Sequence, residues 1–396
     1  ARPENIAALN SQMILRLLML LLLVAGPDPA YAQRGDKEGE AQTTRVPPEK
    51  IPPAPPLSPD QALATFKLPD GFRIELAAAE PLVEAPVVAT FDPEGRLWVV
   101  EMRGYMPNAD GLGEGEPVGR ISVLEDTDGD GRMDKSTVFL DALVMPRALL
   151  LVGSGALLAE PPNLWFVHDT DGDGKADDRK LVASNYALPA DPRRGVSSDP
   201  EVASNGLLWA LDNWIYSASH ATRLRYREGL WSSEPTIPRG QWGLTQDDFG
   251  RLFFNSNTDH LRGDLVPSHN VSRNPNFRAT VGANVQIAQS QSVWPGRVNP
   301  GVNRGYQEDQ LRADGTLATF TAACGPLIYR GDQLPPVFRG NAFVCEPTGN
   351  FVRRDILVET NLSITATNAY DKAEFLTSTD ERFRPVNLFD GPDGAL

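Results

Sequence analysis

The sequence predicts an all-β protein, and more specifically a six-bladed β-propeller. Glycine and proline, 34 of each in 396 residues, are too frequent for a helical protein and usual for one built from short strands and turns. Long helical periodicity is scarce after residue 66. Instead, one pattern returns six times: a few alternating residues, a turn with Asp, Asn or Gly, and a strongly apolar strand.

The clearest copy of the pattern covers residues 86–102 (PVVATFDPEGRLWVVEM). The other copies cover 149–161, 204–219, 243–257, 334–347 and 385–396. Their turns are separated by roughly 40 to 90 residues, which indicates blades of about four strands with variable loops. A β-sandwich gives similar hairpins but usually needs far fewer residues, so we prefer the propeller.

The ends of the predicted propeller are incomplete. The last copy stops at Leu396, where its apolar strand would begin, so we expect the last strand or strands to be missing through C-terminal truncation. Residues 71–80 (GFRIELAAAE) precede the first copy, and we expect them to be the outer strand that closes the ring onto the last blade.

Three parts are predicted along the chain. Residues 1–32 are upstream residues followed by a signal peptide, with Arg16, an apolar run at 17–25 and a small-residue cleavage site ending at Ala32. The apolar run is too short for a membrane-spanning helix, which needs about 20 residues. Residues 33–66 form a polar, Pro-rich, disordered linker, and residues 67–396 form the propeller. We therefore expect an exported protein, periplasmic or at the cell surface.

The formal net charge of −15 argues against nucleic acid as a partner, because nucleic-acid binding needs clustered Lys and Arg. It leaves small molecules and other proteins as the expected partners.

Two acidic loops share the sequence Asp-Thr-Asp-Gly-Asp-Gly followed by a fourth Asp. Their aspartates are Asp126, Asp128, Asp130 and Asp134 in the first loop, and Asp169, Asp171, Asp173 and Asp177 in the second. Oxygen donors at alternate positions with a Gly at the sharp turn are typical of Ca²⁺ loops. The flanks read as strands, not helices, so these are not EF-hands. We predict β-hairpin loops that hold Ca²⁺ in a structural role, with an acidic turn without an ion as the alternative.

The chain has two cysteines, Cys324 and Cys345, both in strand-like sequence. In an exported chain this pair predicts a disulfide, and two buried free thiols are the alternative. There is no Cys-x-x-Cys-His, so no covalent haem is attached within this chain.

Several long stretches resemble the N-terminal propeller of a planctomycete and verrucomicrobial family of membrane-bound dehydrogenase-type proteins (PVC-type haem-binding proteins). The stretches are LPDGFRIELAAAEPLVEAPVVATFDPEGRLWVVEMRGY, GRISVLEDTDGDGRMDKSTVFLDAL, NGLLWALDNWIY, VNPGVNRGYQ, FTAACGPLIYRGDQLP and GNAFVCEPTGNFVRR. The resemblance covers about residues 68–396. It implies a propeller related to soluble quinoprotein glucose dehydrogenases.

The resemblance also implies a function. A sugar or other alcohol would be oxidised with pyrroloquinoline quinone (PQQ) as cofactor, and electrons would pass to a cytochrome c domain or partner. The chemistry needs a general base for the hydroxyl proton. The quinoprotein dehydrogenases use a His just before a blade-opening Gly, but residues 200–206 (PEVASNG) contain no His.

Other residues must then supply the site. His220 and His260 follow predicted inner strands, where propellers place groups facing the central channel, and Glu201 is an alternative base. As polar neighbours for the cofactor we predict Asn205, Asn257, Arg262 and Arg330. Trp242 or Trp294 could stack on a sugar.

Two other functions stay open from the sequence. One is a non-catalytic propeller, stabilised by Ca²⁺, that binds glycans or proteins; the absence of the expected His favours it. The other is a lactonase-like hydrolase in which a central Ca²⁺ activates water. That function needs Glu, Asn and Asp side chains converging on the channel, and the sequence assigns no such set.

Overall fold

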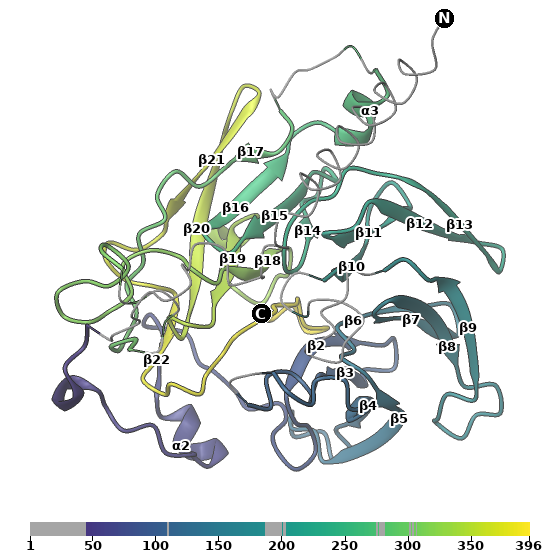
Figure 1. Ribbon diagram of the computed structural model, residues 1–396, viewed down its shortest axis with the longest axis horizontal. Coiled ribbons are helices and arrows are strands. Elements are labelled where there is room, and N and C mark those ends of the chain that lie inside the picture. The colour runs from purple at the N-terminus through teal and green to yellow at the C-terminus, as the bar shows by residue number, and fades with distance from the viewer. Residues whose placement is uncertain are drawn as a thin grey trace, which may run out of the picture. The chain divides into compact units, whose positions relative to one another are not determined.

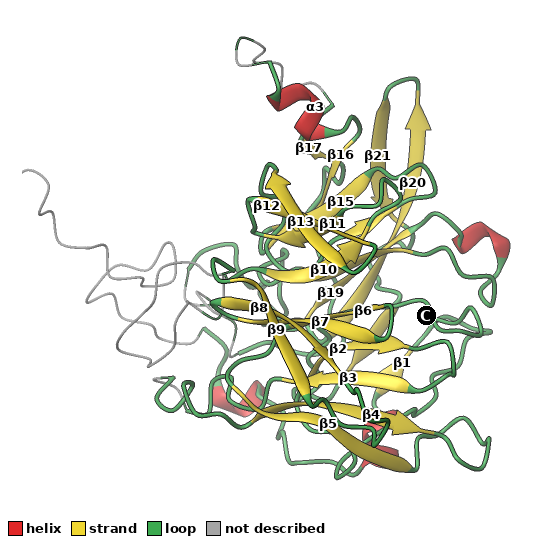
Figure 2. Ribbon diagram, turned by 90° about the vertical axis from the view of Figure 1, so that its right-hand side faces the viewer, coloured by secondary structure: helices red, strands yellow, loops and turns green. Residues whose placement is uncertain are grey.

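The computed structural model describes residues 45–108, 111–186, 200, 203–274, 276, 282–300, 302, 305 and 307–396. The predicted signal peptide, residues 33–44 of the predicted linker and Glu201 lie outside the described residues. Strands dominate this part of the chain, and its helices are all short (Figure 2). None of these helices has the length and apolar character needed to cross a membrane.

The described residues form five antiparallel sheets arranged as a β-propeller (Figure 1). The first two sheets contain β2 (Pro86–Phe91), β3 (Leu97–Glu101), β4 (Gly119–Glu125) and β5 (Lys135–Leu143), then β6 (Ala148–Val152), β7 (Gly155–Glu160), β8 (Asn163–His168) and β9 (Asp178–Ala183). The next two contain β10 (Asn205–Trp209), β11 (Ile215–Ala218), β12 (Thr222–Arg227) and β13 (Leu230–Pro235), then β14 (Thr245–Gln246), β15 (Leu252–Ser256), β16 (Asp259–Asp264) and β17 (Val285–Gln286). The fifth contains β18 (Cys324–Ile328), β19 (Ala342–Glu346), β20 (Phe351–Thr360), β21 (Ser363–Asn368), β22 (Leu376–Ser378) and β1 (Phe66–Lys67).

Five of the six predicted turns are hairpins between the first two strands of a sheet. Each contains a residue with a positive φ, which a tight hairpin turn requires. These residues are Gly95, Gly153, Asn213, Gly250 and Gly340, with φ between 59° and 84°. The repeated pattern in the sequence therefore marked the inner hairpin of every sheet.

The prediction of six blades is wrong for the described residues, which form five sheets. The sixth copy, 385–396, forms no strand and ends in a turn in which Gly391 N donates to Ala395 O. It contacts the first and last sheets: the Asn387 side chain donates to Val87 O on β2, and Val386 lies against Gly325 on β18. After β18, Gln333 N and the Tyr329 hydroxyl donate to Gly394 O. This segment therefore lies between the two sheets without forming a hydrogen-bonded ladder with either.

The fifth sheet includes the strand that comes first in the chain. Residues 71–80, expected to be the closing strand, are not in a strand, and β1 pairs with β22 instead, with Phe66 opposite Ser378. Two short helices precede β1: η1 (Pro48–Lys50) and α2 (Pro59–Leu63). Ser58 caps α2, because its Oγ accepts from Gln61 N while its own N–H donates to Gln61 Oε1.

Apolar faces of neighbouring sheets pack against each other. One cluster joins the first and second sheets around Val100, Ile121 and Leu158, and another joins the second and third around Leu164 and Ile215. Fully buried Phe, Ile and Leu side chains on alternate strand positions supply most of the stabilisation, at about 1.5–3 kcal/mol for each large side chain. Two further helices, α3 (Ser268–Ser272) and η2 (Pro336–Phe338), lie in connections.

Cys324 and Cys345 are direct partners across β18 and β19. Both are buried free thiols, so the structure does not contain the predicted disulfide. The Cys324 thiol instead donates to Pro385 O at 3.6 Å. Burial raises the pKa of both thiols, which keeps them protonated.

Candidate functional site

The two acidic loops connect strands, as predicted: the first joins β4 to β5 and the second joins β8 to β9. Ligand oxygens of Asp126, Asp128 and Asp130 lie within 4.8 Å of one another, as do those of Asp169, Asp171 and Asp177. Asp134 and Asp173 lie outside these two clusters. Clustered, exposed carboxylate oxygens with room for water are the ligand set that Ca²⁺ prefers, so the residues fit the predicted cation.

Backbone amides shape each acidic loop. Asp126 accepts from Gly131 N and Gly129 N, and the backbone donor at Gly131 is the main cause that lowers the pKa of its carboxyl. Asp169 is held in the same way by Gly174 N. The two loops are therefore similar in conformation as well as in sequence, and the first carboxylate of each has a lowered pKa.

His220 is buried in the third sheet, with 6% of its surface exposed. Its Nδ1 lies 3.5 Å from Ser204 Oγ. Because Ser204 Oγ donates its own hydrogen to Ser219 O, it can accept one from Nδ1. The other ring nitrogen, Nε2, is buried and has no hydrogen-bond partner among the residues that the structure describes. Burial lowers the pKa of His220 to about 4, so the imidazole is neutral at pH 7 and its Nε2 carries a free lone pair.

Tyr186 lies beside His220, with ring centroids 4.7 Å apart. Its side chain is fully buried, with its hydroxyl near the side chain of Ser217. Burial raises the pKa of Tyr186, which keeps the hydroxyl protonated and able to donate. Arg147 is buried nearby and donates to Met145 O and Pro200 O. The Tyr186 ring and the neutral imidazole of His220 thus pack against each other in a buried position.

The described residues around His220 do not form a cradle for PQQ. PQQ carries three carboxylates, which need several cations or donors. Arg147 is the buried cation there, and it already donates to two carbonyls. Arg223, on the same sheet as His220, is paired with Glu234. The donor set of the described residues is therefore too small for this cofactor.

His260 is fully buried at the start of β16. Its Nε2 lies 2.6 Å from Asp355 Oδ2, and its Nδ1 lies 2.6 Å from Gln291 Oε1. The same amide oxygen accepts the His260 backbone N–H, which fixes the amide orientation, so Nδ1 must be a donor. His260 has no exposed surface, so it can act on a ligand only through Asp355.

The four predicted cofactor-binding residues do not converge. Asn205 binds backbone: its amide donates to Ala203 O and Gln241 O, and its oxygen accepts from Gly243 N. Arg262 is held by Asp259 and Asn284. Asn257 is half-buried, and its N–H donates to the Gln241 side chain.

Arg330 lies at the opposite end of the strands from His260. It faces Asp248, in the turn between β14 and β15, whereas His260 follows the turn between β15 and β16. It therefore cannot share a site with His260.

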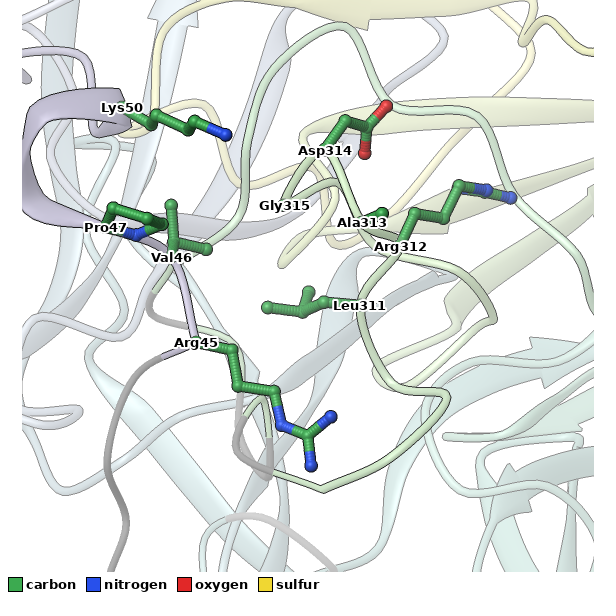
Figure 3. Close-up of a pocket in the computed structure, with 9 residues that line it drawn as sticks. All are labelled: Arg45, Val46, Pro47, Lys50, Leu311, Arg312, Ala313, Asp314 and Gly315. Atoms are coloured by element: carbon green, nitrogen blue, oxygen red, sulfur yellow. The ribbon is translucent and has the colours of Figure 1, made fainter.

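A small cavity lies between residues 45–50 and 311–315, where Val46 and Leu311 point toward each other (Figure 3). Its volume is about 30 Å³, which suits one water molecule. It is therefore too small for a sugar.

The sequence arguments missed Tyr186 and Arg147 beside His220, and Arg353 and Asp355 beside His260. A signal for the second pair was present. The stretch FVRRDILVET places three charged residues at the beginning of an otherwise apolar strand, and charges inside a buried strand need partners or ligands. No comparable signal marks Tyr186.

Residues 58–396 match the model of the family described as a domain of unknown function (DUF7133), so the chain belongs to this family. No curated protein sequence matches the chain. The narrower planctomycete and verrucomicrobial family named from the sequence stays a prediction.

Several solved structures are similar in fold. The PQQ domain of pyranose dehydrogenase from Coprinopsis cinerea is 14% identical, with 83% of this chain and 92% of that chain covered and a TM-score of 0.46. The calcium structure of a Carbohydrate-Active Enzymes Family AA12 protein from Trichoderma reesei is 16% identical, with 83% and 93% covered and a TM-score of 0.45. Virginiamycin B lyase from Staphylococcus aureus is 14% identical, with 78% and 76% covered and a TM-score of 0.36. At these identities the likeness concerns the fold alone.

Proposed function

We propose that this propeller is an oxidoreductase that removes hydrogen from a hydroxyl group of a sugar or other alcohol, with His220 as the general base. One observation carries the proposal. The buried Nε2 of a neutral His220 has no hydrogen-bond partner among the described residues, and the ring of the buried Tyr186 packs against the imidazole. Unpaired buried polar groups cost about 1–3 kcal/mol each, so their retention calls for a ligand or a role.

Tyr186, His220 and Ser204 each have a different role in the proposed proton transfer. The Tyr186 hydroxyl donates to the oxygen of the bound alcohol and positions it. The His220 lone pair at Nε2 accepts the hydroxyl proton, and the Ser204 oxygen accepts from Nδ1 and holds the ring.

The remaining parts of the function rest on the sequence. The family resemblance implies PQQ as hydride acceptor and a cytochrome c domain or partner as the next carrier. Because the described residues around His220 do not fit PQQ, the proposed proton transfer does not depend on that cofactor, and an added dye can take the two electrons. Export to the periplasm or cell surface is proposed from the signal peptide. Ca²⁺ is proposed in the two acidic loops, held by the carboxylates that cluster there, where it would fix the hairpins between β4 and β5 and between β8 and β9.

The test uses the full chain in a dye-reduction assay with a panel of sugars and alcohols. PQQ and Ca²⁺ are added together, separately or not at all. We expect turnover of at least one substrate with the dye as electron acceptor, and the additions of PQQ and Ca²⁺ show whether either is needed. His220→Gln should then lower kcat by about 10²–10⁴, the usual contribution of a general base.

The matched control is His168→Gln, on β8 of the second sheet, which should keep its activity. The proposal fails if no substrate gives turnover under any of these conditions. It fails equally if His220→Gln is as active as the unmodified protein.

A further inference from the structure

A cavity of about 250 Å³ lies on the fifth sheet, away from His220. Its lining comes from three segments: the beginning of β20, the end of β21 with the residues that follow it, and residues 289–294. These segments are held together, because Ala288 bridges to Ala366 on β21 and Trp294 N donates to Glu374. The cavity is thus built from one sheet and a connection that is bonded to it.

Two buried charged residues of β20 line this cavity. Arg353 and Asp355 are each 1% exposed, and they stand two positions apart on the strand, so their side chains lie on the same face. Arg353 Nη1 and Asp355 Oδ1 are 3.9 Å apart, which is too far for a hydrogen bond. Neither atom has a hydrogen bond to the described residues, so each keeps capacity for a ligand.

The rest of both side chains is rigidly held. Arg353 donates from Nε and Nη2 to the Glu374 carboxylate and from Nη2 to Ser292 O. Asp355 is held from behind by His260 at 2.6 Å. One edge of each side chain is therefore hydrogen-bonded to the protein, and the other edge faces the cavity. Such support is what a preorganised binding site requires.

The walls of the cavity are aromatic and its charge is balanced. Trp294 and Tyr370 both line it, and both are half-buried. Besides the buried pair, the lining includes the exposed Asp371 and Lys372. Two cations and two anions cancel, so the cavity has no net attraction for a charged ligand.

We propose that this cavity binds one ring of a neutral sugar. A hydroxyl group both donates and accepts, so neighbouring hydroxyls of a sugar can accept from Arg353 Nη1 and donate to Asp355 Oδ1, and both bonds are strengthened by charge. An aromatic wall at Trp294 matches the apolar face of a pyranose. The volume lies just below the about 300–1,000 Å³ of pockets for drug-sized ligands, which suits a single ring.

Other ligand classes match the cavity less well. A phosphate or carboxylate ligand would meet the Asp355 carboxylate next to the only buried cation that the described lining provides. A purely apolar ligand would leave both buried charges without hydrogen bonds, at a cost of several kcal/mol. The site is independent of the proposed oxidation, because His220 belongs to the third sheet and Arg353 and Asp355 belong to the fifth.

The test is titration calorimetry on the full chain with glucose, mannose, galactose, N-acetylglucosamine and cellobiose, and with glucuronate as the anionic probe. We expect at least one neutral sugar to bind and glucuronate to bind more weakly than glucose. Trp294→Ala should weaken the binding at least tenfold. Asp355→Asn removes the charged acceptor while keeping the shape, and it should weaken binding by a similar factor.

The controls separate this inference from a general loss of structure and from the proposed function. Phe249→Ala changes an exposed aromatic residue at the turn between β14 and β15, and it should bind as the unmodified chain does. If Asp355→Asn does not fold, as judged by its near-ultraviolet circular dichroism, Trp294→Ala still decides the question, since Trp294 is half-buried.

His220→Gln should keep the sugar binding of the cavity even where it abolishes dye reduction. The inference is overturned if no neutral sugar binds. It is also overturned if Trp294→Ala leaves the affinity unchanged, or if glucuronate binds best.

Discussion

The buried imidazole of His220 predicts a specific loss of stability in mild acid. The folded protein keeps this group neutral, because burial lowers its pKa from 6.5 to about 4. In the unfolded chain the same histidine takes up a proton near pH 6.5. Between these two values the unfolded state binds more protons than the folded state, so the free energy of unfolding falls as the pH falls.

The magnitude follows from the pKa gap. Each pKa unit is about 1.4 kcal/mol, so the gap corresponds to about 3 kcal/mol once the pH is below 4. The contribution is absent above about pH 7, where both states are neutral, and it reaches about 2 kcal/mol at pH 5. Against a total stability of about 5–15 kcal/mol for a typical protein, this loss is easily measured.

The assay is urea unfolding, followed by tryptophan fluorescence, at intervals from pH 7 to pH 4.5. Other groups also titrate in this range, so the quantity of interest is the difference between the unmodified protein and His220→Gln. We expect the unmodified protein to lose about 2 kcal/mol more than this variant between pH 7 and pH 5. Tyr186→Phe keeps the histidine and should follow the unmodified protein. Parallel pH profiles for the unmodified protein and His220→Gln would refute the reasoning.

Four other predictions concern single features of the fold. Adding Ca²⁺ should raise the Tm measured by differential scanning calorimetry, and EDTA should reverse this increase. The increase should be smaller in Asp126→Asn. Gly325→Ala should destabilise the protein by about 2 kcal/mol or more in urea unfolding, because the added Cβ would lie 2.5 Å from a backbone oxygen; Gly229→Ala, also at positive φ but in open space, should cost less. Asn205→Ala should cost about 2–4 kcal/mol in the same measurement through the loss of three hydrogen bonds. The two thiols should react with a disulfide reagent only after unfolding, because both are buried, and a rapid reaction of the native protein would contradict this.

The inner hairpins of the sheets were predictable because local sequence dictates them. In the turn DPEGR, Asp92 accepts from the Glu94 and Arg96 backbone N–H groups and pairs with the Arg96 side chain. The turn DDFGR repeats the arrangement with Asp247 and Arg251. Such short-range signals can be read in one sequence.

The number of sheets depended on non-local pairing, which the sequence does not display. The sixth copy has the turn residues of the others, yet its hydrogen bonds to β2 and to the residues after β18 do not form a ladder. The closing strand was misplaced for the same reason. The alternating residues 71–80 read well as a strand, but the pairing that occurs uses only Phe66 and Lys67.

The candidate site was only partly predictable. His220 and His260 were found because a histidine after an inner strand is a local signal. Tyr186 lies in the connection after β9 and Asp355 lies on the fifth sheet, so neither is close in sequence to its histidine. Cys324 and Cys345 were found as a facing pair, and they face each other as free thiols.

The pairing of β1 with β22 has a consequence for how the chain folds. Thr65 and Ser378 are 313 residues apart and share a hydrogen bond between their hydroxyls. Bringing such distant residues together in an unfolded chain costs about 5 kcal/mol in loop-closure entropy. This cost is larger than the stabilisation that two pairs of strand residues provide. The four intervening sheets must therefore be in place first, so that β1 docks onto a fifth sheet whose position is already set. This orders the assembly of the molecule, makes the β1 segment the last to become protected from hydrogen exchange, and makes its release the first step of unfolding.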